Sequence, residues 1–291
     1  MKQYNEEQKL LMLSDVSLGY EPTKPILKNV NLTEFNITRE GIEATGQITA
    51  FIGRSGRGKS TLFKGLTGLL LPTAGHIYIT NANGEDVNDA KILSEGDVGF
   101  VDQKYTLFRH KTINQICHYA LRKKNTKGLS FFKKLFYRDT KEQKVEKEAI
   151  INEYLNEWGL MAHKNKYPCD LSGGQRQRTA IIEQMLTDKH FMILDEPFSG
   201  LDVGNIEKVK QSFQRISDAN ELNTIIFSTH DIRLAVELAD SIYIVGFPEG
   251  TTEYSTIVGH YDLKKLGLAW EEYGNGHRAL VSDIKELLLK S

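Results

Sequence analysis

The feature that most constrains this chain is a glycine-rich run between an apolar segment and an amphipathic one. The run consists of Gly53, Arg54, Ser55, Gly56, Arg57, Gly58, Lys59, Ser60 and Thr61. An apolar stretch, residues 48–52, precedes it, and Leu62, Phe63, Leu66 and Leu69 follow it at helical spacing. This order predicts a strand, a glycine loop and a helix, and the loop is typical of a phosphate-binding site.

Each residue type in the loop has a reason to contact phosphate. Glycines at positions 53, 56 and 58 let backbone N–H groups point inward, and the start of the helix adds partial positive charge. Lys59 would reach the β and γ phosphates, and the Ser60 hydroxyl would bind Mg²⁺. The alternative, a Gly/Ser surface turn, does not explain the strand and helix on either side. We therefore expect a nucleoside triphosphate ligand.

A second glycine-rich segment lies near the middle of the chain. Residues 171–175 contain Ser172, Gly173, Gly174 and Gln175, and an amphipathic run follows them. This pattern predicts a second nest of N–H groups at a helix N-terminus. One cradle is enough for one triphosphate, so the second suggests that the nucleotide is held from two sides.

Two acidic residues follow the apolar run 191–194. Asp195 is positioned to hold the Mg²⁺ shell, and Glu196 to polarise an attacking water. Paired acids are common on protein surfaces, so this pattern indicates catalysis only together with the glycine loop.

Two further polar residues each follow a predicted strand. His230 comes after the apolar run 224–227, and Gln103 comes after the run 98–101. His230 could contact the γ phosphate, and Gln103 could sense Mg²⁺ and the lytic water. The alternatives are a bystander histidine and a glutamine that caps a strand.

Composition narrows the class of protein. A net charge of −1 gives no global basis for nucleic acid as the main partner, and two isolated cysteines exclude a disulfide framework. Residues 1–9 are polar, unlike a signal peptide, and no apolar window is long enough to cross a bilayer. These features favour a reducing cytosolic setting, with any membrane span supplied by another chain.

Short apolar runs alternate with helical patterns along most of the sequence. Strands are expected at residues 10–20, 26–32, 48–52, 77–79, 98–101, 191–194, 224–227 and 242–245, with a final helix at 282–289. This alternation predicts an α/β fold with a largely parallel sheet covered on both faces.

A basic segment interrupts this pattern. Residues 121–147 hold ten Lys or Arg against three Asp or Glu, and Phe131, Phe132 and Phe136 share one helical face within it. Such a segment fits an anionic lipid surface or a partner helix, or it is a solvated face of a small helical subdomain.

Together these motifs resemble the nucleotide-binding subunit of ABC transporters. The resemblance rests on residues 53–61 (Walker A), Gln103 (Q-loop), 171–175 (signature), 191–196 (Walker B with its glutamate), 199–202 (D-loop) and His230 (H-loop), which stand in the family's order. It spans residues 20–230.

The resemblance implies a P-loop NTPase fold with a RecA-like core, an antiparallel β subdomain and an inserted helical subdomain. It implies an ATPase domain over residues 1–245, with the helical subdomain at about 103–170, and a C-terminal tail at 246–291. Two copies would pair head to tail, each sandwiching ATP between one loop 53–61 and the partner's signature.

Tyr20 matches the aromatic that stacks on adenine, although a half-buried strand tyrosine is the alternative. Asp202 matches the residue that communicates across the dimer.

The resemblance also implies partners and location. We expect a cytoplasmic ATPase, peripheral on the inner membrane face, that binds separate permease subunits and, in an importer, works with a substrate-binding protein. The substrate stays open, and residues 261–270 are only faintly similar to nitrate and taurine importers. The rivals are an ABC ATPase acting on nucleic acid, ribosomes or protein assembly, and one serving lipid trafficking or export.

Overall fold

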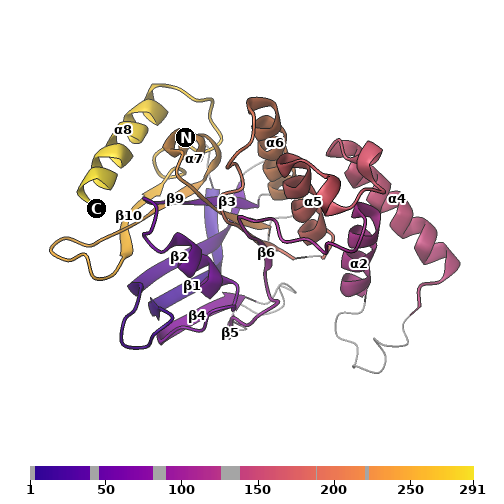
Figure 1. Cartoon of the computed structure of the whole chain (residues 1–291). Helices are drawn as coiled ribbons and strands as arrows, with labels where there is room; N and C mark the ends of the chain where they lie inside the picture. The colour runs from indigo at the N-terminus through magenta and orange to yellow at the C-terminus, as the bar shows by residue number, and fades with distance from the viewer. Residues whose placement is uncertain (1–3, 40–45, 81–89, 126–137, 188, 220–222) are drawn as a thin grey trace. The chain divides into compact units, whose positions relative to one another are not determined.

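The computed structural model describes residues 4–39, 46–80, 90–125, 138–187, 189–219 and 223–291. The chain divides into two compact units, whose elements are labelled in Figure 1. The first unit comprises Met1–Phe100, His190–Ser199 and Lys210–Ser291, and the second comprises Val101–Lys189 and Gly200–Val209. The first unit contains the β-sheets, and the second is mainly helical.

A six-stranded sheet with the order β10-β9-β3-β8-β7-β6 forms the centre of the first unit. Its strands are β3 (Gln47–Ile52), β6 (Gly99–Val101), β7 (Phe191–Leu194), β8 (Thr224–Thr229), β9 (Ser241–Gly246) and β10 (Thr256–Asp262). Strands β9, β3, β8 and β7 pair in parallel, and β10 joins β9 antiparallel. All residues of β3, β7, β8 and β9 are buried, as expected for a parallel sheet covered on both faces.

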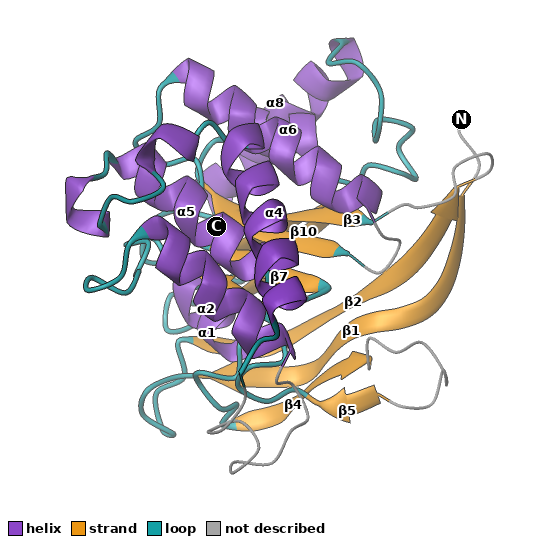
Figure 2. Cartoon of the chain, turned by 90° about the vertical axis from the view of Figure 1, so that its right-hand side faces the viewer, coloured by secondary structure: helices purple, strands orange, loops and turns teal. Residues whose placement is uncertain are grey.

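A four-stranded antiparallel sheet with the order β2-β1-β4-β5 completes the first unit. Its strands are β1 (Tyr4–Leu18), β2 (Leu27–Arg39), β4 (Ala74–Thr80) and β5 (Ala90–Ile92). Figure 2 shows β1 and β2 as two long curved strands. Strand β1 begins before the predicted residue 10, and β2 continues past the predicted residue 32, because backbone pairing continues through polar residues, which an apolar pattern does not reveal. Strand β1 also ends at Leu18, before the predicted residue 20.

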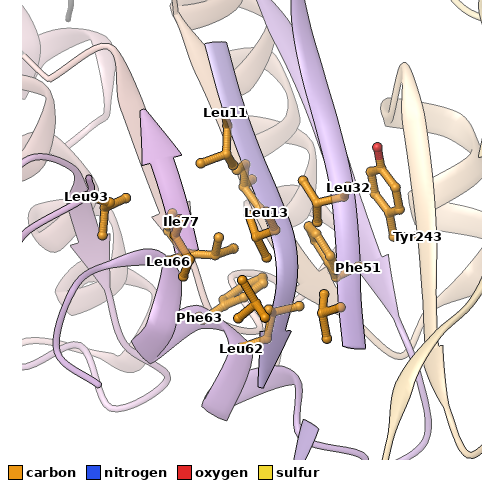
Figure 3. Close-up of a cluster of buried hydrophobic side chains, with 14 of the residues drawn as sticks. Leu11, Leu13, Leu32, Phe51, Leu62, Phe63, Leu66, Ile77, Leu93 and Tyr243 are labelled. Carbon is orange, nitrogen blue, oxygen red and sulfur yellow. The ribbon is translucent and has the colours of Figure 1, made fainter. Parts of the chain in front are cut away.

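The helix α1 (Lys59–Leu66) packs against the antiparallel sheet and against β3. Figure 3 shows Leu62, Phe63 and Leu66 of α1 among side chains of β1 and β3. All three are fully buried, and each contributes about 1.5–3 kcal/mol of hydrophobic stabilisation. Leu69 was expected on the same helix, but α1 ends at Leu66 and Leu69 is 51% exposed.

Two further helices of the first unit pack against each other. Helix α8 (Asn275–Lys290) packs against α7 (Ile232–Leu238) through a buried face that includes Leu280, Val281 and Ile284. It starts earlier than predicted, because the imidazole of His277 accepts a hydrogen bond from the Gly274 N–H and so caps its first turn. Residues 246–291, predicted as a C-terminal tail, include β10 and α8.

The second unit contains α2 (Ile113–Asn125), α4 (Lys141–Glu157), α5 (Gly173–Met185) and two 3₁₀ turns (Met161–His163 and Pro168–Asp170). Helix α6 (Val203–Ala219) starts in this unit and continues in the first. The predicted apolar face of α4, with Ile151, Leu155 and Trp158, is buried. The aromatic residues Phe131, Phe132 and Phe136 of the basic segment lie outside the described residues. Among the helices that are described, none is long and apolar enough to span a membrane.

One buried acid gives the fold a distinct pH dependence. Glu34 of β2 is 3% exposed, and its carboxylate accepts a hydrogen bond from the Thr49 hydroxyl at 3.1 Å. Burial raises the pKa of Glu34 to about 7, against smaller opposing effects of Lys264 and Thr49. The folded protein therefore retains a proton on Glu34 at pH values where the unfolded chain has lost it.

We expect Glu34→Gln to flatten the pH dependence of stability. Between an ordinary pKa of 4.5 and about 7, the folded state binds more protons, so the free energy of unfolding falls as pH rises. This group contributes a fall of the order of 3 kcal/mol, which the neutral amide removes. Urea unfolding at pH 5 and pH 8 measures it, with the exposed Glu249→Gln as control. An unchanged difference in Glu34→Gln would contradict the assignment.

Candidate functional site

The glycine loop joins the end of β3 to the start of α1, as predicted. Gly56 and Gly58 have φ values of 80° and 88°, which a residue with a Cβ adopts only with strain. A Cβ on Gly53 would lie 2.4 Å from the carbonyl oxygen of Val245, so the loop and β9 approach more closely than any larger residue allows. The loop is thus a compact backbone cradle at a helix N-terminus.

Lys59 is folded back over this loop. Its side chain is 9% exposed, and its Nζ donates to the Gly53 carbonyl at 2.7 Å. Burial lowers the pKa of the Lys59 ammonium, while the carboxylates of Glu196 and Asp195 oppose that shift. A phosphate oxygen is a stronger acceptor than a backbone carbonyl for this ammonium group.

Asp195 and Glu196 lie directly after β7, and the neighbouring strand holds both in place. The Ser228 hydroxyl donates to Asp195 Oδ1 at 2.6 Å and accepts the Glu196 N–H at 2.9 Å. Asp195 is 6% exposed, and Ser228 is fully buried. Their side chains meet because β7 and β8 pair in parallel with Leu194 opposite Phe227.

Glu196 also contacts the two other predicted catalytic residues of the first unit. Its carboxylate lies 3.0 Å from Nδ1 of His230 and 4.0 Å from Nζ of Lys59. Its backbone has a φ of 52°, an uncommon value for a residue that is not glycine. Strained backbone of this kind clusters at functional sites.

Tyr20 is in a loop beyond the end of β1 and is 61% exposed, so the half-buried strand alternative is wrong. Lys64 of α1 donates to its hydroxyl at 2.9 Å, and this hydrogen bond lowers the pKa of Tyr20. Lys64 Nζ also lies 5.3 Å from the centroid of this exposed ring, which is an aromatic surface that a base can stack on.

The remaining predicted residues belong to the second unit. Gln103 is exposed in a turn that follows β6, and this turn is closed by a hydrogen bond from the Tyr105 N–H to the Asp102 carbonyl at 3.0 Å. Asp102 also binds the backbone and hydroxyl of Thr106, at 3.0 Å and 2.7 Å. A well-defined turn therefore presents Gln103.

The second glycine segment begins α5, as predicted. Ser172 and Gln175 form a capping box, in which the Gln175 N–H donates to the Ser172 hydroxyl at 3.3 Å and the Gln175 side chain accepts the Ser172 N–H at 2.9 Å. The Gln175 amide nitrogen lies 3.0 Å from Nε2 of His163. The position of a Cβ on Gly173 has no heavy atom within 4 Å, whereas a Cβ on Gly174 would lie 3.2 Å from the side chain of Leu201, so the helix start is open at Gly173.

Asp202 precedes α6 and caps it. Its carboxylate accepts the backbone N–H of Asn205 at 2.9 Å and the side-chain amide at 2.6 Å, and these hydrogen bonds lower its pKa.

The first unit therefore brings together Lys59, Asp195, Glu196 and His230, while Gln103, residues 172–175 and Asp202 belong to the second unit. The sequence reasoning did not identify Ser228 as a functional residue. Ser228 lies near the end of β8, next to Asp195. This neighbourhood follows from the register of β7 and β8, which the sequence alone does not show.

A model of the family "ABC transporter" matches residues 42–199, more than half of the chain. The chain is a member of the ABC transporter family. Its curated ABC relatives include the sulfate/thiosulfate import ATP-binding protein CysA of Gloeobacter violaceus, 34% identical over 69% of this chain and 52% of that protein. CysA 2 of Shewanella oneidensis is 35% identical over 79% of this chain and 60% of that protein. The match thus spans 52–60% of the length of these two CysA proteins.

Solved ABC structures share the fold. The structure of cbiO1 from Clostridium perfringens, part of an ABC transporter complex, has a TM-score of 0.65 at 22% identity and covers 90% of this chain and 92% of that one. A dimeric structure of the ATP-binding cassette MJ0796 with ADP and Pi has a TM-score of 0.62 at 25% identity, covering 87% and 99%. The predicted P-loop NTPase fold class is confirmed, and a nucleotide is the ligand this family binds.

Proposed function

We propose that this chain is an ATPase that energises an ABC membrane transporter. The observation that carries the proposal is the convergence of Lys59, Glu196 and His230 at the glycine loop, within one unit. ATP hydrolysis requires an ammonium group that binds phosphate and a carboxylate that activates water, with an imidazole beside that carboxylate. Family membership supports the same chemistry.

The residues of the first unit have distinct proposed roles. The N–H groups of residues 53–61 and the Lys59 ammonium bind the β and γ phosphates. Glu196 acts as general base on the attacking water, and His230 stabilises the γ phosphate. Ser228 is a positioning residue, because its hydroxyl holds both acidic residues at fixed distances.

Mg²⁺ is the expected cofactor, and the residues present fit it. Ser60 and Asp195 of the first unit offer oxygen ligands, which Mg²⁺ prefers, and the Ser228 hydroxyl already holds the Asp195 carboxylate at 2.6 Å. The side-chain oxygen of Gln103 is the third proposed ligand. Among the described residues, no group of three His, Cys, Asp or Glu side chains could hold a metal ion by itself. When bound, Mg²⁺ would neutralise charge that develops on the phosphates.

The second unit supports a shared site. Because residues 172–175 form a separate helix start that is open at Gly173, we propose that they bind the γ phosphate of an ATP held by a second copy of this chain. Asp202 communicates across this dimer, and Gln103 senses Mg²⁺ and the lytic water. ATP then closes the dimer, and hydrolysis reopens it.

Partners and location follow from this function. We propose a cytoplasmic position on the inner membrane face, with separate permease subunits that carry the membrane spans. The names of the CysA relatives favour an importer, which adds a substrate-binding protein as a partner. The permease and the binding protein, not this chain, would select the substrate.

We expect Tyr20→Leu to weaken ATP binding about tenfold, because stacking on a base is worth about 1–3 kcal/mol. Titration of a fluorescent ATP analogue measures the change. Tyr20→Phe is the matched control, since it keeps the ring but loses the hydrogen bond from Lys64. Wild-type affinity in Tyr20→Leu would remove this residue from the adenine site.

The proposal is tested by phosphate release from the purified chain with ATP and Mg²⁺ at several protein concentrations. Because each site needs two copies, the rate per chain should rise with concentration before it levels off. No hydrolysis at any concentration, or a rate per chain that does not depend on concentration, would contradict a shared site.

A further inference from the structure

Arg57 of the glycine loop stacks on a phenylalanine from a distant part of the chain. Its guanidinium carbon lies 3.8 Å from the ring centroid of Phe247. The other cation–π pairs found among the described residues have distances of 5.0–5.9 Å. This pair therefore has the closest contact of its kind in that part of the molecule.

The backbone at Phe247 is held by a strand end and by hydrogen bonds. It directly follows β9, whose Val245 carbonyl contacts Gly53 at the start of the loop. Its N–H donates to the carbonyl of Ser291 at 3.3 Å. The hairpin that begins at Phe247 returns to β2, where the Lys28 N–H donates to Ser255 at 3.0 Å. The backbone at Phe247 is therefore held by β9 and by the C-terminal residue Ser291, neither of which belongs to the loop.

Arg57 itself occupies a sensitive position. It stands between Gly56 and Gly58, both in the left-handed region, so its conformation helps set the direction of the neighbouring N–H groups. Its Nε is buried, and in the described part of the chain it makes no hydrogen bond. A buried N–H without an acceptor is costly, and an anion bound beside the loop would supply one.

We propose that Phe247 is a positioning residue for nucleotide binding, because its ring holds the Arg57 guanidinium against the glycine loop before the nucleotide arrives. This inference rests on the proposed nucleotide-binding function. Without the ring, Arg57 would sample several rotamers, and binding would bear the cost of ordering it. With the ring in place, the loop is preorganised, and the positive charge of Arg57 stays at the site that binds phosphate.

A double-mutant cycle tests this role. Phe247→Leu, Arg57→Ser and the double variant are compared with the wild type by titration of a fluorescent ATP analogue and by steady-state hydrolysis. We expect Phe247→Leu to weaken nucleotide affinity about three- to tenfold, with a matching rise in KM and an unchanged kcat. In the Arg57→Ser background the same change should have no further effect, because its target is gone. Phe247→Tyr, which keeps a stacking ring, should restore wild-type affinity.

Tyr254→Leu is the matched control. The Tyr254 ring lies in the same hairpin, but the cation over it is Lys28, whose Nζ is 5.2 Å from the ring centroid. It should leave affinity unchanged. Two results would overturn the inference: wild-type affinity in Phe247→Leu, or an equal loss in both Arg57 and Arg57→Ser backgrounds, which would mean that the ring acts through general packing. A wild-type chain that binds no ATP would instead overturn the proposed function.

Discussion

Replacing Glu196 by glutamine is expected to lower kcat about 10²- to 10⁴-fold, the usual contribution of a general base. The amide cannot accept the proton of the attacking water. It keeps the size of the carboxylate and can still contact His230, so the site should keep its shape. ATP binding should therefore persist, and the variant should accumulate as a closed dimer when ATP is present.

Phosphate release and light scattering after size exclusion measure these two effects. Glu249→Gln, which makes the same change at an exposed position of the first unit, should behave like the wild type. Normal turnover in Glu196→Gln would remove this residue from the chemical step. Loss of ATP binding would show instead that its charge mainly supports Lys59, 4.0 Å away.

Replacing Lys59 by methionine should have the second large effect. It should weaken ATP binding as well as slow hydrolysis. Hydrogen bonds to charged groups contribute about 1.5–3 kcal/mol each, so two lost phosphate contacts weaken ATP affinity roughly 10²- to 10⁴-fold. Methionine keeps the apolar stem that packs in the 9% exposed site. The fold should therefore survive.

Isothermal titration with ATP measures the affinity, and circular dichroism checks the fold. Lys285→Met removes the same charge from the exposed face of α8 and should leave affinity unchanged. Binding within threefold of wild type in Lys59→Met would contradict the assignment of the loop as the phosphate site.

Apolar patterning predicted the buried strands well and the half-exposed ones poorly. The bounds of β7 match the expected residues 191–194, because all four residues are apolar and buried. Strand β10 was not predicted, since none of its residues is buried and it contains Gly259 and His260. Its pairing with β9 depends on tertiary structure, which a local pattern does not contain.

In the candidate site, residues set by a local sequence pattern were predicted, and those that depend on tertiary structure were not. Acidic residues at a strand end and lysine in a glycine loop were recognisable because their chemistry requires those types in that order. The bridge from Ser228 to Asp195 and Glu196 was not, because it arises from the register of two strands more than 25 residues apart in sequence. Tyr20 is exposed because β1 ends at Leu18, a boundary that alternation alone did not locate.

The central claim, that this chain energises a membrane transporter, is tested most directly by its partner. Tagged Glu196→Gln protein would be captured with ATP from gently solubilised membranes, and the proteins that accompany it identified by mass spectrometry. The account predicts a protein with several membrane-spanning helices in stoichiometric amount. Recovery of ribosomes, DNA or only soluble proteins would contradict it and favour an ABC ATPase outside the membrane.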